Sequence, residues 1–169
     1  VTLNPNGGTL PEGADDEIDG TYDEPLGELP TPEKEGHTFG GWEDEEGNIY
    51  EEGDIVDLVE DTTLTAIWTV NTYNVTYNYS QNGGTSATRT SDTVAYNTAI
   101  DLTPTATKAD WTFLGWNTNS NASTALNSLT MGTSDVTLYA IYANLEVSPV
   151  TVTLDLSGTD ERQITIDRK

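Results

Sequence analysis

The sequence has no cysteine and only one histidine, and these two absences exclude several kinds of site. Without cysteine the chain can form neither a disulfide nor a zinc site with thiolate ligands. Its one histidine, His37, would have to serve any histidine-dependent nucleophile, yet Trp111 stands in the corresponding place of a second copy of the same motif. We interpret His37 as an aromatic residue at a strand edge, and we expect no catalytic residue and no cofactor.

Basic residues are scarce: six Lys and Arg stand against 29 Asp and Glu, for a formal net charge of −23. Residues 1–68 hold 20 of the acids and one lysine, whereas residues 72–142 hold four acids and two basic residues. Nucleic acids and anionic membrane surfaces are bound by cationic patches, so we expect neither as a partner. We interpret the acidic surface as a solvated face.

Long apolar runs are also absent. None approaches the ~20 residues that a membrane-spanning helix needs, so we expect no membrane insertion in this segment. The sequence begins at Val1, inside a predicted strand, which leads us to expect a fragment of a longer protein whose export signal lies elsewhere.

An internal repeat organises what is present. The segment His37–Trp42 recurs as Trp111–Trp116, so the motif reappears 74 positions later with four of its six residues unchanged. A repeat of this length indicates small units in tandem. We predict an acidic unit at residues 1–70 (the first repeat), a neutral unit rich in Thr and Asn at 71–143 (the second repeat), and a β tail at 144–169.

The repeated motif raises a problem of strand geometry. Side chains alternate between the two faces of a strand, so Phe39 and Trp42 should point in opposite directions. A β-bulge at Gly41, and another at Gly115 in the second copy, would bring both rings of each copy into one core. Otherwise one ring of each copy packs on a neighbouring unit. The aromatic residues paired across the copies are expected in the cores: Trp42 with Trp116, and Trp68 with Tyr142.

The middle of each copy predicts a second strand, ending near Tyr22 and near Tyr96. The segments that follow, Pro25–Leu29 and Thr98–Leu102, are long enough for only one or two helical turns. The predicted fold class is therefore α+β and rich in β structure.

Both copies contain the same features in the same order, and together they resemble the Listeria–Bacteroides repeat, also called the internalin B-repeat. The matching residues are Asn6–Gly8 and Asn82–Gly84, Tyr22 and Tyr96, Leu29-Pro30 and Thr103-Pro104, Thr38–Trp42 and Thr112–Trp116, and Thr63–Trp68 and Thr137–Tyr142. The resemblance implies two tandem β-grasp-like (ubiquitin-like) units in a bacterial cell-surface protein, and it implies no catalytic residues.

The tail predicts two strands, Val150–Leu156 and Gln163–Ile166, joined by a turn. It resembles the opening of a bacterial immunoglobulin-like domain. A hairpin alone is marginal in water, so it would dock on the second repeat or begin a further domain.

Two further kinds of site, a calcium-binding loop and a lysine isopeptide bond, have plainer interpretations. Asp15–Gly20 begins like an EF-hand loop, but Leu26 replaces the twelfth-position glutamate, so we expect no metal site. Lys34 and Lys108 occupy corresponding positions and could in principle form isopeptide bonds. Their polar surroundings favour solvated lysines instead, because that chemistry needs a buried apolar setting.

Two aromatic residues lack a core aromatic as their counterpart in the acidic copy, since Trp111 matches His37, which is able to act as a polar group, and Tyr139 matches Thr65. These two are our candidate ligand contacts. The predicted function is a non-catalytic stalk or spacer and interaction module of an extracellular bacterial surface or cell-wall protein. The alternative is an adhesin that binds a host glycan or matrix protein through these aromatics. The other expected partners are neighbouring domains of the same chain.

Overall fold

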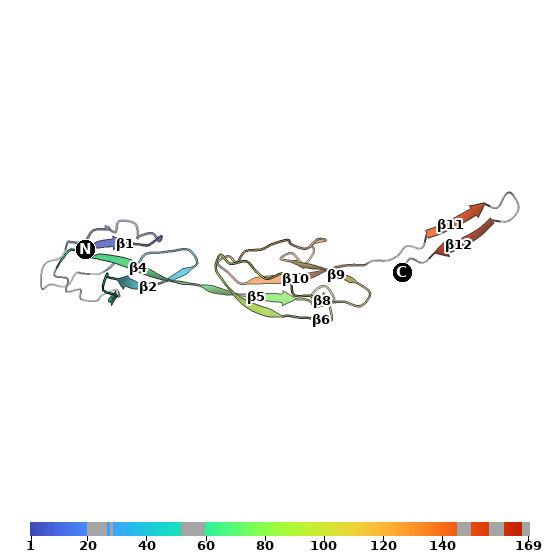
Figure 1. The fold of residues 1–169 in the computed structure, drawn as a ribbon, viewed down its shortest axis with the longest axis horizontal. Helices are drawn as coiled ribbons and strands as arrows, with labels where there is room; N and C mark the ends of the chain where they lie inside the picture. Colours follow the sequence, from blue (N-terminus) through green and yellow to red (C-terminus); the bar gives the residue numbers. More distant parts are fainter. Residues whose placement is uncertain (20–26, 28, 52–59, 145–149, 156–160, 167–169) are drawn as a thin grey trace. The chain divides into compact units, whose positions relative to one another are not determined.

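The computed structural model of the chain describes residues 1–19, 27, 29–51, 60–144, 150–155 and 161–166. Those ranges consist of strands and turns without a helix, which confirms the β-rich part of the predicted fold (Figure 1). The strands are β1 (Thr2–Asn4), β2 (His37–Glu43), β3 (Ile49–Tyr50), β4 (Thr63–Val70), β5 (Thr72–Asn78), β6 (Ser86–Ala87), β7 (Ser91–Ala95), β8 (Ala106–Thr107), β9 (Thr112–Asn117), β10 (Val136–Ala143), β11 (Val150–Asp155) and β12 (Glu161–Ile166).

The strands of the first repeat form one mixed sheet in the order β1-β4-β2-β3. β1 runs parallel to β4, with Leu3 opposite Leu64, so the first and last strands of the repeat are neighbours. β2 runs antiparallel to β4 along its other side, and β3 pairs with the end of β2. This arrangement turns Leu64 and Ala66 of β4 into the core, as the alternating pattern of the strand requires.

Of the two alternatives, the β-bulge is the one present, and it occurs in both copies. The register between β2 and β4 shifts between Phe39 and Trp42, and that between β9 and β10 shifts between Ile141 and Tyr142. Gly41 and Gly115 at these shifts have φ values of 112° and 134°, which side chains other than glycine rarely adopt. The rings of Phe39 and Trp42 consequently meet edge to face, with centroids 5.6 Å apart.

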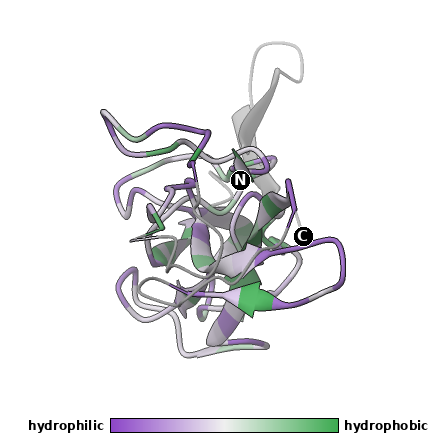
Figure 2. Cartoon of the chain, turned by 90° about the vertical axis from the view of Figure 1, so that its left-hand side faces the viewer, coloured by the Kyte–Doolittle hydropathy of each residue, from purple (hydrophilic) through white to green (hydrophobic). Residues whose placement is uncertain are grey.

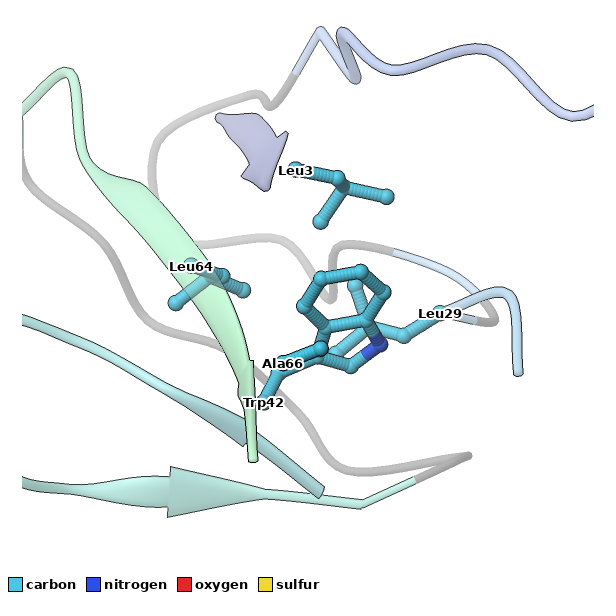
Figure 3. Close-up of a cluster of buried hydrophobic side chains, with 5 residues drawn as sticks. All are labelled: Leu3, Leu29, Trp42, Leu64 and Ala66. Atoms are coloured by element: carbon cyan, nitrogen blue, oxygen red, sulfur yellow. The ribbon is translucent and has the colours of Figure 1, made fainter. Parts of the chain in front are cut away.

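The core of the first repeat gathers around one indole ring. Trp42 is fully buried, and its ring lies among Leu3, Leu29, Leu64 and Ala66, contributed by β1, β4 and the segment before β2 (Figure 3). These residues are far apart in the sequence, so the ring ties together segments that no local interaction would join.

The second repeat has a four-stranded sheet in the order β7-β5-β10-β9 and a small sheet of β6 and β8. β7 pairs antiparallel with β5 and confirms the predicted second strand of this copy, whereas the corresponding Tyr22 lies outside the described residues. The helical turns expected at Thr98–Leu102 do not form. Ile100 donates its N–H to Leu129 O at 2.8 Å, a residue distant in the sequence and not one within a helical turn. The counterpart segment, Pro25–Leu29, falls largely outside the described residues.

By compactness the chain divides into two units that do not coincide with the repeats. The first unit comprises residues 1–76, 91–102 and 127–137, and the second comprises residues 77–90, 103–126 and 138–169. The limits that we predicted from the repeat, at residues 70 and 143, remain predictions.

Within the first unit, Asn71 is the single residue between β4 and β5, and three hydrogen bonds hold it. Its N–H donates to Gly36 O at 2.9 Å, and its carbonyl accepts from Tyr96 N–H at 2.8 Å. The Thr38 hydroxyl donates to Asn71 Oδ1 at 2.6 Å. The backbone and the side chain of this short link are therefore both engaged.

The tail forms the predicted hairpin, in which β11 pairs antiparallel with β12 from Val150 opposite Ile166 to Asp155 opposite Glu161. Across the described ranges, hydrophobic residues concentrate on strands and hydrophilic residues on loops (Figure 2). No helix in the described part of the chain is long and apolar enough to cross a membrane.

Candidate functional site

The Asn-Gly-Gly turn of each repeat is fastened to the closing strand by its asparagine side chain. Asn6 Nδ2 donates to Ala66 O at 3.0 Å, and Asn82 Nδ2 donates to Ala140 O at 2.9 Å. Asn82 donates a further hydrogen bond to Ser120 O at 3.0 Å. Each turn is thereby held against the strand that carries core residues, and the residues beside the turn are held in place with it.

A lysine lies over this turn in both repeats, and its role differs between them. Lys34 Nζ donates to Asn6 O at 3.0 Å and lies 5.6 Å from the ring of Trp68. Lys108 Nζ lies 3.7 Å from the ring of Trp111 and 5.6 Å from that of Tyr142. Both lysines are half-buried against an aromatic ring, so each contacts its repeat as well as solvent; that their ammonium groups are solvated stays a prediction.

The second repeat has a hollow of about 260 Å³ beside this lysine. Its indole wall, Trp111, is 39% exposed, which agrees with the exposure that the sequence predicts. Tyr139, the other predicted contact, is half-buried on β10 opposite Asn117 and does not line the hollow. The residues that line it are Asn82, Lys108, Trp111, Ser120, Asn121, Ala122, Ile141 and Tyr142, and all belong to the second compact unit.

One buried polar atom in this wall has no hydrogen-bond partner within the described residues, namely the hydroxyl of Tyr142. Burial also raises the pKa of this hydroxyl above its ordinary value, so it stays protonated and able to donate. The corresponding residue of the first repeat, Trp68, instead donates its indole N–H to Pro5 O at 3.1 Å. The second repeat has thus left a donor unused where the first has satisfied one.

The corresponding hollow of the first repeat, about 680 Å³, has a different character. His37 stands in the place of Trp111, and its Nδ1 lies 2.8 Å from Glu35 O. Glu33 and Glu35 flank Lys34, whose ammonium is already bonded to the turn. The indole in this hollow, that of Trp68, is half-buried, and the lysine ammonium already donates a hydrogen bond.

The acidic segments are engaged in turns rather than arranged around an ion. Asp44 accepts hydrogen bonds from the side chain of Asn48, from the backbone of Asn48 and Glu46, and from Tyr50, which together hold its pKa below the ordinary value. In the segment Asp15–Asp19, Asp16 O accepts from Leu3 N–H at 2.7 Å. Among the described residues no three His, Cys, Asp or Glu side chains gather into a group that could hold a metal ion.

The sequence pointed to Trp111 but not to the residues that shape the hollow around it. Asn82 belongs to a repeated turn and Lys108 to a repeated lysine, and those signals gave position without orientation. Ser120 and Asn121 carry no signal, because they lie in a loop whose path depends on Asn82. Chemically, the hollow offers a flat apolar face, one ammonium and several amide and hydroxyl groups, which suits binding rather than turnover.

Replacing Asn82 by aspartate is expected to destabilise the second repeat by about 2 kcal/mol or more, measured by urea unfolding followed by circular dichroism. The substitution keeps the shape of the side chain but exchanges its donor for a charged acceptor that faces Ala140 O and Ser120 O. Asn121→Asp, at an exposed neighbour, is the matched control and should change stability little. Equal losses of stability in the two variants would show that the Asn82 side chain does not hold the turn against the closing strand.

Comparison with known proteins gives matches over both copies. The sequence profile of the Listeria–Bacteroides repeat domain matches residues 1–67 and again residues 73–141. A protein of Evansella cellulosilytica that is named as a membrane protein is 30% identical over 159 residues, which are 94% of this chain and 22% of that protein. The chain thus spans less than a quarter of this relative. No solved structure matches.

Proposed function

Because the chain belongs to the Listeria–Bacteroides repeat domain family, with two tandem copies at residues 1–67 and 73–141, we propose that it is a non-catalytic spacer and interaction segment of an extracellular bacterial surface protein. The family is typical of bacterial surface proteins, and the relative named as a membrane protein is consistent with a location at the cell envelope. The family assignment itself confirms the resemblance that the repeated motifs indicated.

For each repeat we propose a β-grasp-like fold. The order β7-β5-β10-β9 sets the first and last strands of the second repeat side by side in the middle of the sheet. In the first repeat the corresponding strands β1 and β4 are also neighbours, and they run parallel. A parallel pair formed by the ends of a short segment requires a crossover connection between them, as β-grasp-like folds have.

The observation that best supports the spacer function is that two repeats of very different charge are held together by the same hydrogen bonds. Trp42 donates its indole N–H to Pro30 O at 3.0 Å, and Trp116 donates to Pro104 O at 2.6 Å. The turn asparagine and the bulged glycine likewise serve both copies. An array of such units gains length by adding copies, with surfaces free to vary while the interior stays the same.

A spacer also needs a link that does not act as a loose tether. Asn71 alone separates β4 from β5, and hydrogen bonds to Gly36, Tyr96 and Thr38 hold it within the first unit. Such a link leaves few free backbone torsions, in contrast to a Gly- and Ser-rich linker.

Single-molecule energy transfer tests the spacer function. The chain has no cysteine, so Glu12→Cys and Thr118→Cys, both at exposed positions, would accept the two dyes uniquely. We expect a narrow distribution of dye separations that widens when Asn71 is replaced by five Gly and Ser residues. The same insertion in the exposed turn at Gly47 should leave the distribution narrow. A chain whose distribution is already as wide as that of the linker variant would contradict a spacer.

The second candidate function is an adhesin module. The exposed indole of Trp111 beside a hollow with an uncommitted lysine favours it, since an aromatic face with a few polar groups is a common binding surface. Binding of labelled full chain to arrays of glycans and matrix proteins would support this candidate, and a blank array would favour the spacer alone.

A further inference from the structure

We propose that the hollow of the second repeat binds one neutral sugar residue, which stacks on Trp111 and takes hydrogen bonds from Lys108 Nζ and Asn121. The inference rests on the adhesin candidate above and narrows it to a single site and a single class of ligand. All three residues line the same hollow.

The size of the hollow and its indole wall favour a single small ring. Its volume of about 260 Å³ lies just below the ~300 Å³ at which pockets for drug-sized ligands begin. Trp111 keeps 39% of its surface exposed although Lys108 Nζ lies 3.7 Å from its ring. A sugar presents a face of C–H groups, which packs on an indole, and a rim of hydroxyl groups, which turns toward polar neighbours.

The polar groups around the indole match such a rim. Within the described part of the chain, Lys108 Nζ makes ring contacts but no hydrogen bond or ion pair, so its three donors remain available. The Asn121 side chain is exposed and offers both a donor and an acceptor.

The charge of the chain favours a neutral sugar over an acidic one. The formal net charge is −23, and within the second repeat Lys108 is followed two residues later by Asp110. A single ammonium on a chain of this charge makes a poor site for an anion, which must approach through a negative field. Hydroxyl groups meet no such repulsion, so binding should depend little on salt concentration.

The first repeat provides an internal comparison. Its lysine, Lys34, is bonded to Asn6 O, and the place of the indole is taken by His37. The indole in the hollow of the first repeat, that of Trp68, is half-buried, and one donor of Lys34 is already used. We therefore expect only the second repeat to bind.

The test uses the full chain and an array of immobilised oligosaccharides that end in neutral hexoses, neutral N-acetylhexosamines or acidic sugars. A hit is then titrated as its methyl glycoside by calorimetry. We expect Trp111→His, which installs the residue of the first repeat, to weaken binding about tenfold or more through lost stacking. Trp111→Phe should retain much of the affinity, and Lys108→Gln should weaken binding severalfold.

Two variants outside the hollow serve as controls. Leu114→Ala, at a residue of β9 that is 44% exposed and outside the hollow, and His37→Ala should bind as the unaltered chain does. A blank for all neutral sugars, binding of acidic sugars only, or full affinity in a folded Trp111→His chain would each overturn the proposal. The spacer function is judged separately, because Trp111→His should leave the distribution of dye separations unchanged.

Discussion

Replacing Trp116 by alanine is expected to lower the free energy of unfolding of the second repeat by about 3–5 kcal/mol. The side chain is 1% exposed, and its ring meets Tyr77 and Phe113 edge to face at 5.2 and 5.4 Å between centroids. Truncation would leave a cavity and would also remove the hydrogen bond to Pro104 O, whose length is 2.6 Å. Differential scanning calorimetry suits the measurement, because removing a tryptophan alters the fluorescence itself.

Two further variants separate the contributions to this loss. Trp116→Phe keeps most of the apolar ring but leaves Pro104 O without its donor, so it should cost about 1–2 kcal/mol. Trp42→Ala removes the corresponding ring of the first repeat, with its bond to Pro30 O, and should cost as much as Trp116→Ala. A loss below about 1 kcal/mol for either alanine variant would show that its repeat does not depend on the ring.

Replacing Gly84 by alanine is expected to destabilise the second repeat by about 3 kcal/mol, an effect of lost space. An added Cβ would run into the backbone oxygen of Tyr79 and the hydroxyl of Tyr142, and would lie 3.2 Å from Thr107 O. Backbone oxygens cannot swing aside as a flexible side chain can, so the turn itself would have to shift. Thermal unfolding of the variant against the unaltered chain measures the cost.

The controls for this prediction are two other alanine substitutions. Gly8→Ala in the first repeat meets Trp68 Cζ2 at 2.5 Å and Glu33 O at 2.9 Å, so it should be comparably damaging. Gly132→Ala has nothing within 4 Å and should stay within about 0.5 kcal/mol of the unaltered chain. If Gly84→Ala cost as little stability as Gly132→Ala, Tyr142 would not be packed against this turn.

The bulges show how far local rules reach. Alternation of side chains along Phe39–Trp42, together with the glycines between the rings, indicated a bulge and a shared core as one of two outcomes. This much follows locally because the conflict is confined to four consecutive residues, and Gly41 adopts the required φ easily. The same argument carried over to the second copy without change.

The helical turns at Thr98–Leu102 show where those rules stop. Five residues can form a turn of helix only if their neighbours leave the backbone groups unpaired. Here the N–H of Ile100 and the carbonyl of Thr98 form hydrogen bonds with Leu129 and Met131, so these groups are not free to form a helical turn. Nothing within the five residues indicates a partner some thirty positions away.

By itself the sequence determined the tandem repeat, the family, the β-rich class, the positions at which a bulge could form and the aromatic residues of the cores, because each follows from spacing or from a local conflict. Only the tertiary structure decided what the two lysines do. Lys34 and Lys108 occupy the same position of the repeat, yet one is bonded to Asn6 O and the other lies on an exposed indole. The difference arises because a long cationic side chain takes its partner from whatever the fold brings beside it.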